Sequence, residues 1–156
     1  MIRALRKKIQ LLLVNLFLMI YTRKKDFSFS QQEFENQDKN QLKNILIYSS
    51  TALGDFMMNS PAIHALRQTY PSATITLICH KKMYDFLKGG SDWDDLISWD
   101  NKLTTLPALV KEIKKRGTPD LTVILHSHTP YDFLSAIIAG TKYVFVDNDK
   151  QDIPLV

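Results

Sequence analysis

The chain has 156 residues, a formal net charge of +4 and 45% hydrophobic residues. This length is enough for one domain with its own core. The single cysteine, Cys79, excludes an intrachain disulfide and favours a reducing compartment. No Cys/His cluster has the spacing of a zinc site, so no metal is expected.

Residues 1–26 predict an amphipathic helix that lies in a membrane interface. Thirteen mostly apolar residues, 9–21, lie between two basic clusters, and a straight helix that spans a bilayer needs about 20. A cleaved signal peptide, a helix packed on protein and a short span completed by its flanks are the alternatives. Cations around an apolar run suit an anionic membrane better than a nucleic acid. These cations are Arg3, Arg6, Lys7, Lys8, Arg23, Lys24 and Lys25.

The rest of the chain predicts a polar linker over 27–43 and an α/β domain over 44–156. Strands are expected at 44–49, 73–79, 94–99, 120–126 and 142–146. Helices are expected at 55–70, 81–88, 104–116 and 130–139. Strands that alternate with helices indicate a Rossmann-like parallel sheet with flanking helices and right-handed crossovers.

The most informative part of the chain is the run from Asn44 to Tyr70. An apolar strand is followed by a small polar turn that ends in Gly54-Asp55, and then by an amphipathic helix. Ligands bind at this mouth of a βα unit in open α/β sheets. Asp55 near a helix N-terminus is also consistent with a plain N-cap. Pro61 either starts this helix or kinks one longer helix.

Two stretches resemble glycosyltransferase family nine, the lipopolysaccharide heptosyltransferases and their relatives. The first contains Leu53-Gly54-Asp55, Pro61-Ala62-Ile63-His64-Ala65-Leu66 and Tyr70-Pro71. The second is Asp120 to Pro130, which is similar to a family strand that ends in a His-x-Asn-x-Pro type turn, with His128 where the family has Asn. The resemblance covers residues 44–148.

The resemblance implies an inverting sugar transferase of the GT-B type, in which two Rossmann-like domains face a cleft. The N-terminal domain binds the lipid-linked acceptor and the C-terminal domain binds the nucleotide-sugar donor. Asp55 would be the general base, although a helix N-terminus lowers the pKa of a carboxylate. The other expected substrate-binding residues are Ser50, Thr51, Gly54, His126 and His128.

The resemblance therefore implies the N-terminal acceptor-binding half of a glycosyltransferase, without its donor domain and inactive on its own. The expected partners are a nucleotide-sugar donor, a lipid-linked glycan and the inner-membrane surface, with no nucleic acid and no cofactor. The expected location is cytoplasmic, peripheral to the inner membrane. The alternative is a non-catalytic, membrane-tethered module or truncated remnant that binds a glycolipid or a partner chain.

Overall fold

The computed structural model describes two compact units of the chain. The described residues are 9, 12–14, 16–17, 19–20, 34–36, 38, 41–126 and 130–146. One unit contains residues 1–37 and 149–156, and the other contains residues 38–148. The described residues from 9 to 20 are helical and mostly exposed; the rest of the predicted interface helix lies outside the described residues. No helix in the described part of the chain is long and apolar enough to cross a membrane.

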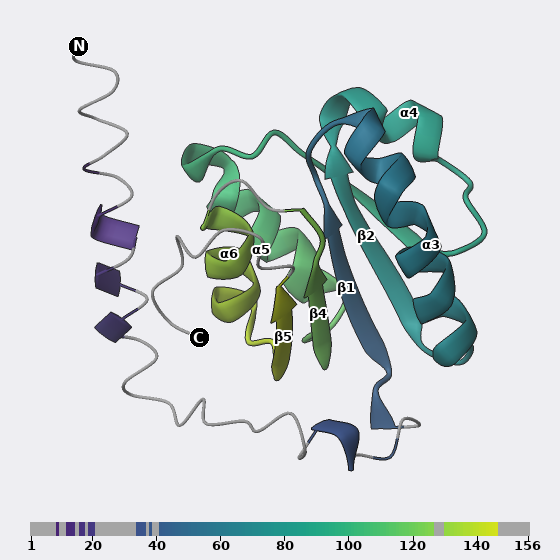
Figure 1. The fold of residues 1–156 in the computed structure, drawn as a ribbon. Helices are drawn as coiled ribbons and strands as arrows, with labels where there is room; N and C mark the ends of the chain where they lie inside the picture. The colour runs from purple at the N-terminus through teal and green to yellow at the C-terminus, as the bar shows by residue number, and fades with distance from the viewer. Residues whose placement is uncertain are drawn as a thin grey trace. The chain divides into compact units, whose positions relative to one another are not determined.

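The second unit is built on five parallel strands, as the sequence predicts (Figure 1). Their order is β3-β2-β1-β4-β5. The strands are β1 (Asn44–Ser49), β2 (Thr74–His80), β3 (Asp95–Trp99), β4 (Leu121–Ile124) and β5 (Tyr143–Val146). β1 and β2 are the apolar centre of this sheet, and Cys79 on β2 is fully buried. Desolvation raises the pKa of the Cys79 thiol to about 11, which marks it as a core residue and not a nucleophile.

Helices cover both faces of the sheet (Figure 1). They are α3 (Leu53–Thr69), α4 (Tyr84–Leu87), α5 (Leu106–Lys115) and α6 (Tyr131–Ala139), with 3-10 turns at Lys81–Met83 and Leu103–Thr105. Right-handed crossovers place α3 and α4 on one face and α5 and α6 on the other. Alternate β1 side chains follow this division. Ser49 accepts a hydrogen bond from Asn59 of α3, whereas the Tyr48 hydroxyl bonds Ser135 of α6 at 2.7 Å.

Pro61 lies inside one continuous helix, α3, so it does not start a new one. In a helix, the Met57 carbonyl would accept a hydrogen bond from the backbone N–H of residue 61. Because proline has no N–H, this bond is missing. The Ser60 hydroxyl donates to this carbonyl at 2.9 Å. The dipeptide Ser60-Pro61 thus supplies its own replacement bond, which allows the helix to continue.

Two aspartates fasten the amino ends of the strands. Asp120 accepts hydrogen bonds from the backbone N–H groups of Lys43 and Asn44, both at 2.9 Å. Asp94 accepts from the Ile75 N–H at 2.8 Å and from Arg67 at 2.6 Å. Desolvation raises the pKa of Asp94, but these two donors outweigh that effect and hold the pKa below its ordinary value.

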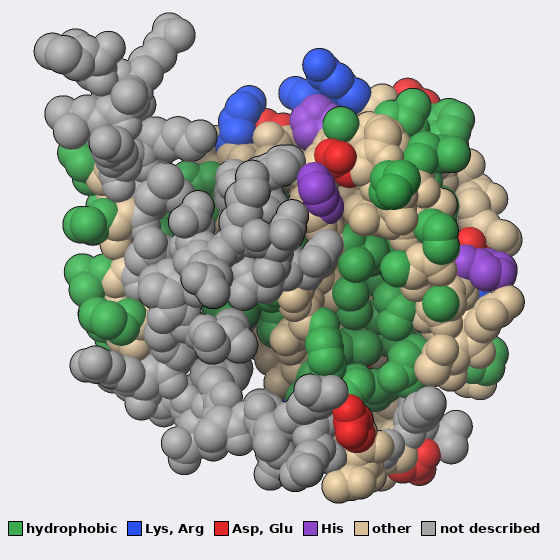
Figure 2. Space-filling model, in the orientation of Figure 1, with side chains coloured by type: hydrophobic (Ala, Val, Ile, Leu, Met, Phe, Trp, Pro, Cys, Tyr) green, Lys and Arg blue, Asp and Glu red, His purple; other side chains and the backbone are tan. Residues whose placement is uncertain are grey.

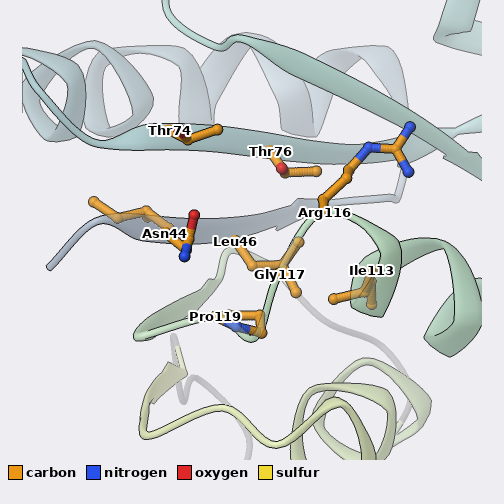
Figure 3. Close-up of a pocket in the computed structure, with 9 residues that line it drawn as sticks. Asn44, Leu46, Thr74, Thr76, Ile113, Arg116, Gly117 and Pro119 are labelled. Atoms are coloured by element: carbon orange, nitrogen blue, oxygen red, sulfur yellow. The ribbon is translucent and has the colours of Figure 1, made fainter.

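A narrow pocket at this amino edge is too small for a substrate (Figure 3). Its volume of about 10 Å³ is scarcely enough for one water molecule. Thr74 and Thr76 of β2 line it together with Gly117, whose φ of 110° is in the left-handed region that glycine tolerates. Ligands of open parallel sheets bind at the carboxyl ends of the strands, so the functional residues are expected at the opposite edge.

Candidate functional site

The carboxyl edge of the sheet brings together three loops that follow β1, β3 and β4. They are the turn 50–52, the loop that starts at Asp100 and the loop that starts at Leu125. Charged and histidine side chains gather along this edge, with hydrophobic side chains beside them over α3 and α4 (Figure 2). In an open parallel sheet, the loops at this edge form the ligand crevice.

Asp55 lies in the first turn of α3, three residues after the N-cap residue Ala52. Its Oδ2 accepts a hydrogen bond from the Ala52 N–H at 3.1 Å. Its Oδ1 lies 3.5 Å from Nε2 of His126. The Asp55 side chain is 29% exposed, so a ligand can reach the carboxylate. Asp55 thus closes the helix end and also faces a second loop.

His126 does not lie on a strand, which corrects one prediction. β4 ends at Ile124, and His126 has a φ of 57° in the left-handed region. The strand predicted over 120–126 therefore ends two residues earlier than expected. A left-handed residue turns the chain and redirects its side chain, here toward Asp55. His128 lies outside the described residues.

The predicted turn residues have different environments. Ser50 is buried, and Thr51 is half-buried with an Oγ1 that is shielded from solvent and has no hydrogen-bond partner among the described residues. Gly54 is helical, and a Cβ atom added to it would meet no atom within 4 Å. Gly54 is therefore not required for a special backbone conformation. The open space beside it leaves room for close approach of a ligand.

Asn101 is a residue of this edge that the sequence did not single out. Its Nδ2 donates to the Ser50 carbonyl at 2.7 Å, which ties the loop after β3 to the turn that precedes α3. Its φ is 56°, and its Oδ1 is buried with no hydrogen-bond partner in the described part of the chain. The only signal in the sequence was a polar run, Asp100-Asn101-Lys102, directly after an apolar strand.

A hollow of about 240 Å³ opens at the end of β3, next to this loop. Its polar lining comes from Lys81, Ser98, Asp100, Thr105 and Glu112. Hydrogen bonds from Thr105 at 2.5 Å and from Lys102 lower the pKa of Asp100 to about 2. Asp100 therefore stays ionised at neutral pH and is a poor proton acceptor.

The carboxyl edge of the sheet combines a carboxylate, an imidazole and two shielded polar oxygens. Among the described residues, no group of three His, Cys, Asp or Glu side chains is placed to hold a metal ion. Asp55 is a reachable carboxylate with one oxygen next to an imidazole. The shielded oxygens of Thr51 and Asn101 are acceptors for hydroxyl groups.

Comparisons with known proteins bear on the fold. No protein-family model and no curated protein sequence matches this chain. A solved structure, the glycosyl transferase family 9 protein from Veillonella parvula DSM 2008, is 23% identical and has a TM-score of 0.62. It aligns with 70% of this chain. The chain shares the fold of a family 9 glycosyltransferase.

Two solved structures of E. coli heptosyltransferase WaaC also match, one with ADP-2-deoxy-2-fluoro heptose and one with ADP. Both have TM-scores of 0.46, with identities of 10% and 11%. They align with 72% and 71% of this chain, and with 45% and 43% of their own chains. Of the Veillonella protein, this chain spans 32% of the length. The resemblance predicted from the sequence is thus confirmed for the fold.

Proposed function

We propose that this chain is the acceptor-binding half of an inverting glycosyltransferase, with Asp55 as the general base. The observation that carries the proposal is the position of Asp55 in a family 9 fold. It is a reachable carboxylate on the first helical turn after β1, at the ligand edge of the sheet. The proposed reaction transfers a heptose-like sugar from a nucleotide sugar to a lipopolysaccharide core or a related surface glycan.

In the proposed step, a hydroxyl oxygen of the acceptor attacks the anomeric carbon of the donor sugar. The bond from that carbon to the phosphate oxygen breaks, and the nucleoside diphosphate leaves with the bonding electrons. The acceptor hydroxyl proton passes to Asp55. One displacement with one base inverts the anomeric centre, so no covalent intermediate with the protein is needed. A positioned base typically contributes about 10²–10⁴-fold to the rate.

His126 positions Asp55 in this proposal. Its Nε2 lies 3.5 Å from Oδ1, while the helix-capping N–H of Ala52 holds Oδ2. The carboxylate is thereby fixed between two elements, which aligns it with an approaching hydroxyl. Thr51 and Asn101, with shielded oxygens at the same turn, are proposed to bind acceptor hydroxyl groups together with Ser50, Gly54 and His128.

The donor, the domain that binds it and the location of the protein in the cell are also proposals. The nucleotide sugar is assigned to a second Rossmann-like domain, and the protein to the cytoplasmic surface of the inner membrane. The bond between Asp55 and the Ala52 N–H favours a second candidate. In that candidate Asp55 only caps α3, and the chain is a non-catalytic module that binds a glycolipid or a partner chain.

The experiment is a ligand titration of the chain followed by amide NMR. We expect heptose-free lipopolysaccharide to shift the signals of residues 50–55 and 126 and to leave those of 117–120, at the amino edge, unchanged. A sugar-free detergent is the control ligand, and a nucleotide sugar should leave both sets unchanged. Shifts at 50–52 and 126 with the nucleotide sugar alone, or equal shifts at these residues with the detergent, would contradict acceptor binding; residues 53–55 are left out of this criterion because exposed apolar side chains of α3 lie beside them.

A further inference from the structure

The exposed face of α3 is apolar over most of its length. Apart from His64, which pairs with Asp92 at 3.0 Å, the exposed residues from Leu53 to Ala65 carry no polar side chain. Met58 is 82% exposed, Met57 58% and Leu53 47%. The exposed residues of this face are Leu53, Gly54, Met57, Met58, Pro61, Ala62 and Ala65.

Helix α5 on the opposite face shows what an ordinary solvated helix of this domain looks like. It buries Leu106, Leu109, Val110 and Ile113 against the sheet. Its exposed positions include Lys111, Lys114 and Lys115. Both helices therefore bury an apolar stripe, but α5 exposes only Pro107 and Ala108 besides its lysines, whereas α3 exposes leucine and methionine side chains. Contiguous exposed apolar surface marks an interaction site more often than scattered residues do.

Helix α4 extends this surface. Phe86 on α4 is 67% exposed. The turn after α4 is linked to the start of α3 through Trp93, whose ring lies edge-on to Phe56 at 6.1 Å and covers Gly90 so closely that a Cβ there would clash. Figure 2 shows hydrophobic side chains over both helices at the upper edge. We call Leu53, Met57, Met58 and Phe86 the apolar rim.

Cations lie at the same edge as the apolar rim. Lys81 and Lys82 are exposed and directly follow β2, whose carboxyl end pairs with that of β1. Anionic membranes bind surfaces of this kind, because the apolar side chains enter the lipid and the lysines contact the negatively charged head groups. Methionine side chains are flexible and adapt to a fluid surface without a fixed shape.

A separate part of the chain has the same chemistry. Apart from the buried Val14, the described residues of the segment 9–20 are exposed apolar side chains, among them Leu12 at 68% and Leu13 at 57%, and basic clusters flank this segment in the sequence. We propose that the apolar rim, together with Lys81 and Lys82, docks the folded domain onto an anionic lipid surface. Asp55 lies between Leu53 and Met57, so docking brings the carboxyl edge of the sheet to the lipid head groups.

The test measures depth at single positions of the full chain. Met58→Cys carries an environment-sensitive fluorophore, and Lys114→Cys on α5 is the matched control. Cys79 is fully buried, and the parent chain reports any labelling there. The vesicles contain equal parts of phosphatidylglycerol and phosphatidylcholine, with or without brominated acyl chains, and no glycolipid. We expect the label at position 58 to shift to the blue and to be quenched by the brominated chains, and the label at 114 to remain unchanged.

Other outcomes overturn the proposal. An unquenched label at position 58 in protein that sediments with vesicles means that another segment carries the binding. A response that grows with protein concentration in the absence of vesicles means that a second copy covers the rim. Met57→Cys repeats the measurement if Met58→Cys does not fold. Because no sugar is present, failure here leaves the proposed transferase activity untouched.

Charge supplies a second measurement. Lys81→Gln with Lys82→Gln is expected to lower the vesicle partition coefficient by about tenfold, since each lysine near an anionic surface contributes to binding. Lys111→Gln with Lys114→Gln removes the same charge from α5 and should have little effect. Equal losses in the two pairs would show a general charge effect and overturn the assignment of the rim.

Discussion

Aspartates at the two edges of the sheet have different partners. At the amino edge, Asp120 accepts two backbone N–H groups, and Asp94 accepts one backbone N–H and the Arg67 guanidinium. At the carboxyl edge, Asp55 accepts one backbone N–H and has its other oxygen 3.5 Å from His126. The first two carboxylates fasten strands, whereas the third has an oxygen directed toward another loop.

The two edges also differ in which residues have a positive φ. At the carboxyl edge, Asn101 and His126 are non-glycine residues with positive φ. At the amino edge, the left-handed position at the end of α5 is filled by Gly117, which adopts it without steric cost. Strained non-glycine residues persist where the surroundings fix them, and they concentrate at functional sites. The comparison thus separates an edge built for stability from an edge that retains strain.

The largest expected effect comes from removing the carboxylate at position 55. Asp55→Asn should lower sugar transfer by about 10²–10⁴-fold, the usual contribution of a positioned base. The assay requires a polypeptide that also carries a donor-binding domain. Asp120→Asn is the matched control at the other edge and should leave the rate per folded molecule unchanged. Full activity of Asp55→Asn would leave only its helix-capping role.

Asp94→Ala should lower the stability of the fold, in contrast to Asp55→Asn, whose main effect is on sugar transfer. It removes the acceptor of the Ile75 N–H and leaves Arg67, which is 18% exposed, without its carboxylate. We expect the free energy of unfolding to fall by ~1–2 kcal/mol, measured by urea denaturation. Asp55→Ala, which removes one capping bond, should cost ~1 kcal/mol or less. A larger loss for Asp55→Ala would reverse the assignment of the two edges.

Acid should weaken the fold through Asp100, a carboxylate with a structural role at the carboxyl edge. Its pKa is about 2 in the folded chain, below the ordinary value of 3.8. Because the Asp100 carboxyl has a lower pKa in the folded chain than in the unfolded chain, its ionised form stabilises the fold at pH values above the unfolded pKa. This contribution is lost as the pH falls from about 4 to about 2. Urea midpoints across this range should therefore fall. In Thr105→Val, which lacks the hydroxyl donor, the fall should be shallower; an identical pH dependence would exclude this cause.

The smallest expected change is that of Asn101→Gly. Glycine adopts a φ of 56° without strain, but the hydrogen bond to the Ser50 carbonyl is lost. These effects oppose each other, so the free energy of unfolding should change by less than about 1 kcal/mol. Amide hydrogen exchange in residues 50–55 should become faster, while that of β2 stays constant. Unchanged exchange in the turn would show that Asn101 does not hold it.

The order of strands and helices could be predicted from the sequence because hydrophobic periodicity is a local signal. The predicted strand 44–49 matches β1, and the predicted helix 104–116 corresponds to a 3-10 turn followed by α5. Boundaries were less certain where a turn needs tertiary contacts. β4 ends at Ile124 and not at 126, because His126 leaves the extended conformation to face Asp55.

The site was only partly predictable. Asp55 was singled out by the family resemblance of Leu53-Gly54-Asp55, because the local pattern alone is equally that of a helix N-cap. The role of Asn101 depends on a hydrogen bond to a residue 51 positions away, and no local signal encodes that contact. The two interpretations of Pro61 were also open, since only the Ser60 bond to the Met57 carbonyl shows how the helix continues.

That bond makes positions 60 and 61 epistatic. With Pro61 in place, Ser60→Ala deprives the Met57 carbonyl of its donor within the helix. With alanine at position 61, the restored N–H satisfies this carbonyl, and the same change at position 60 becomes nearly neutral. A double-mutant cycle between the two positions should therefore give a nonzero coupling energy. The helix that carries the proposed base therefore tolerates both substitutions best if Pro61 is replaced before Ser60.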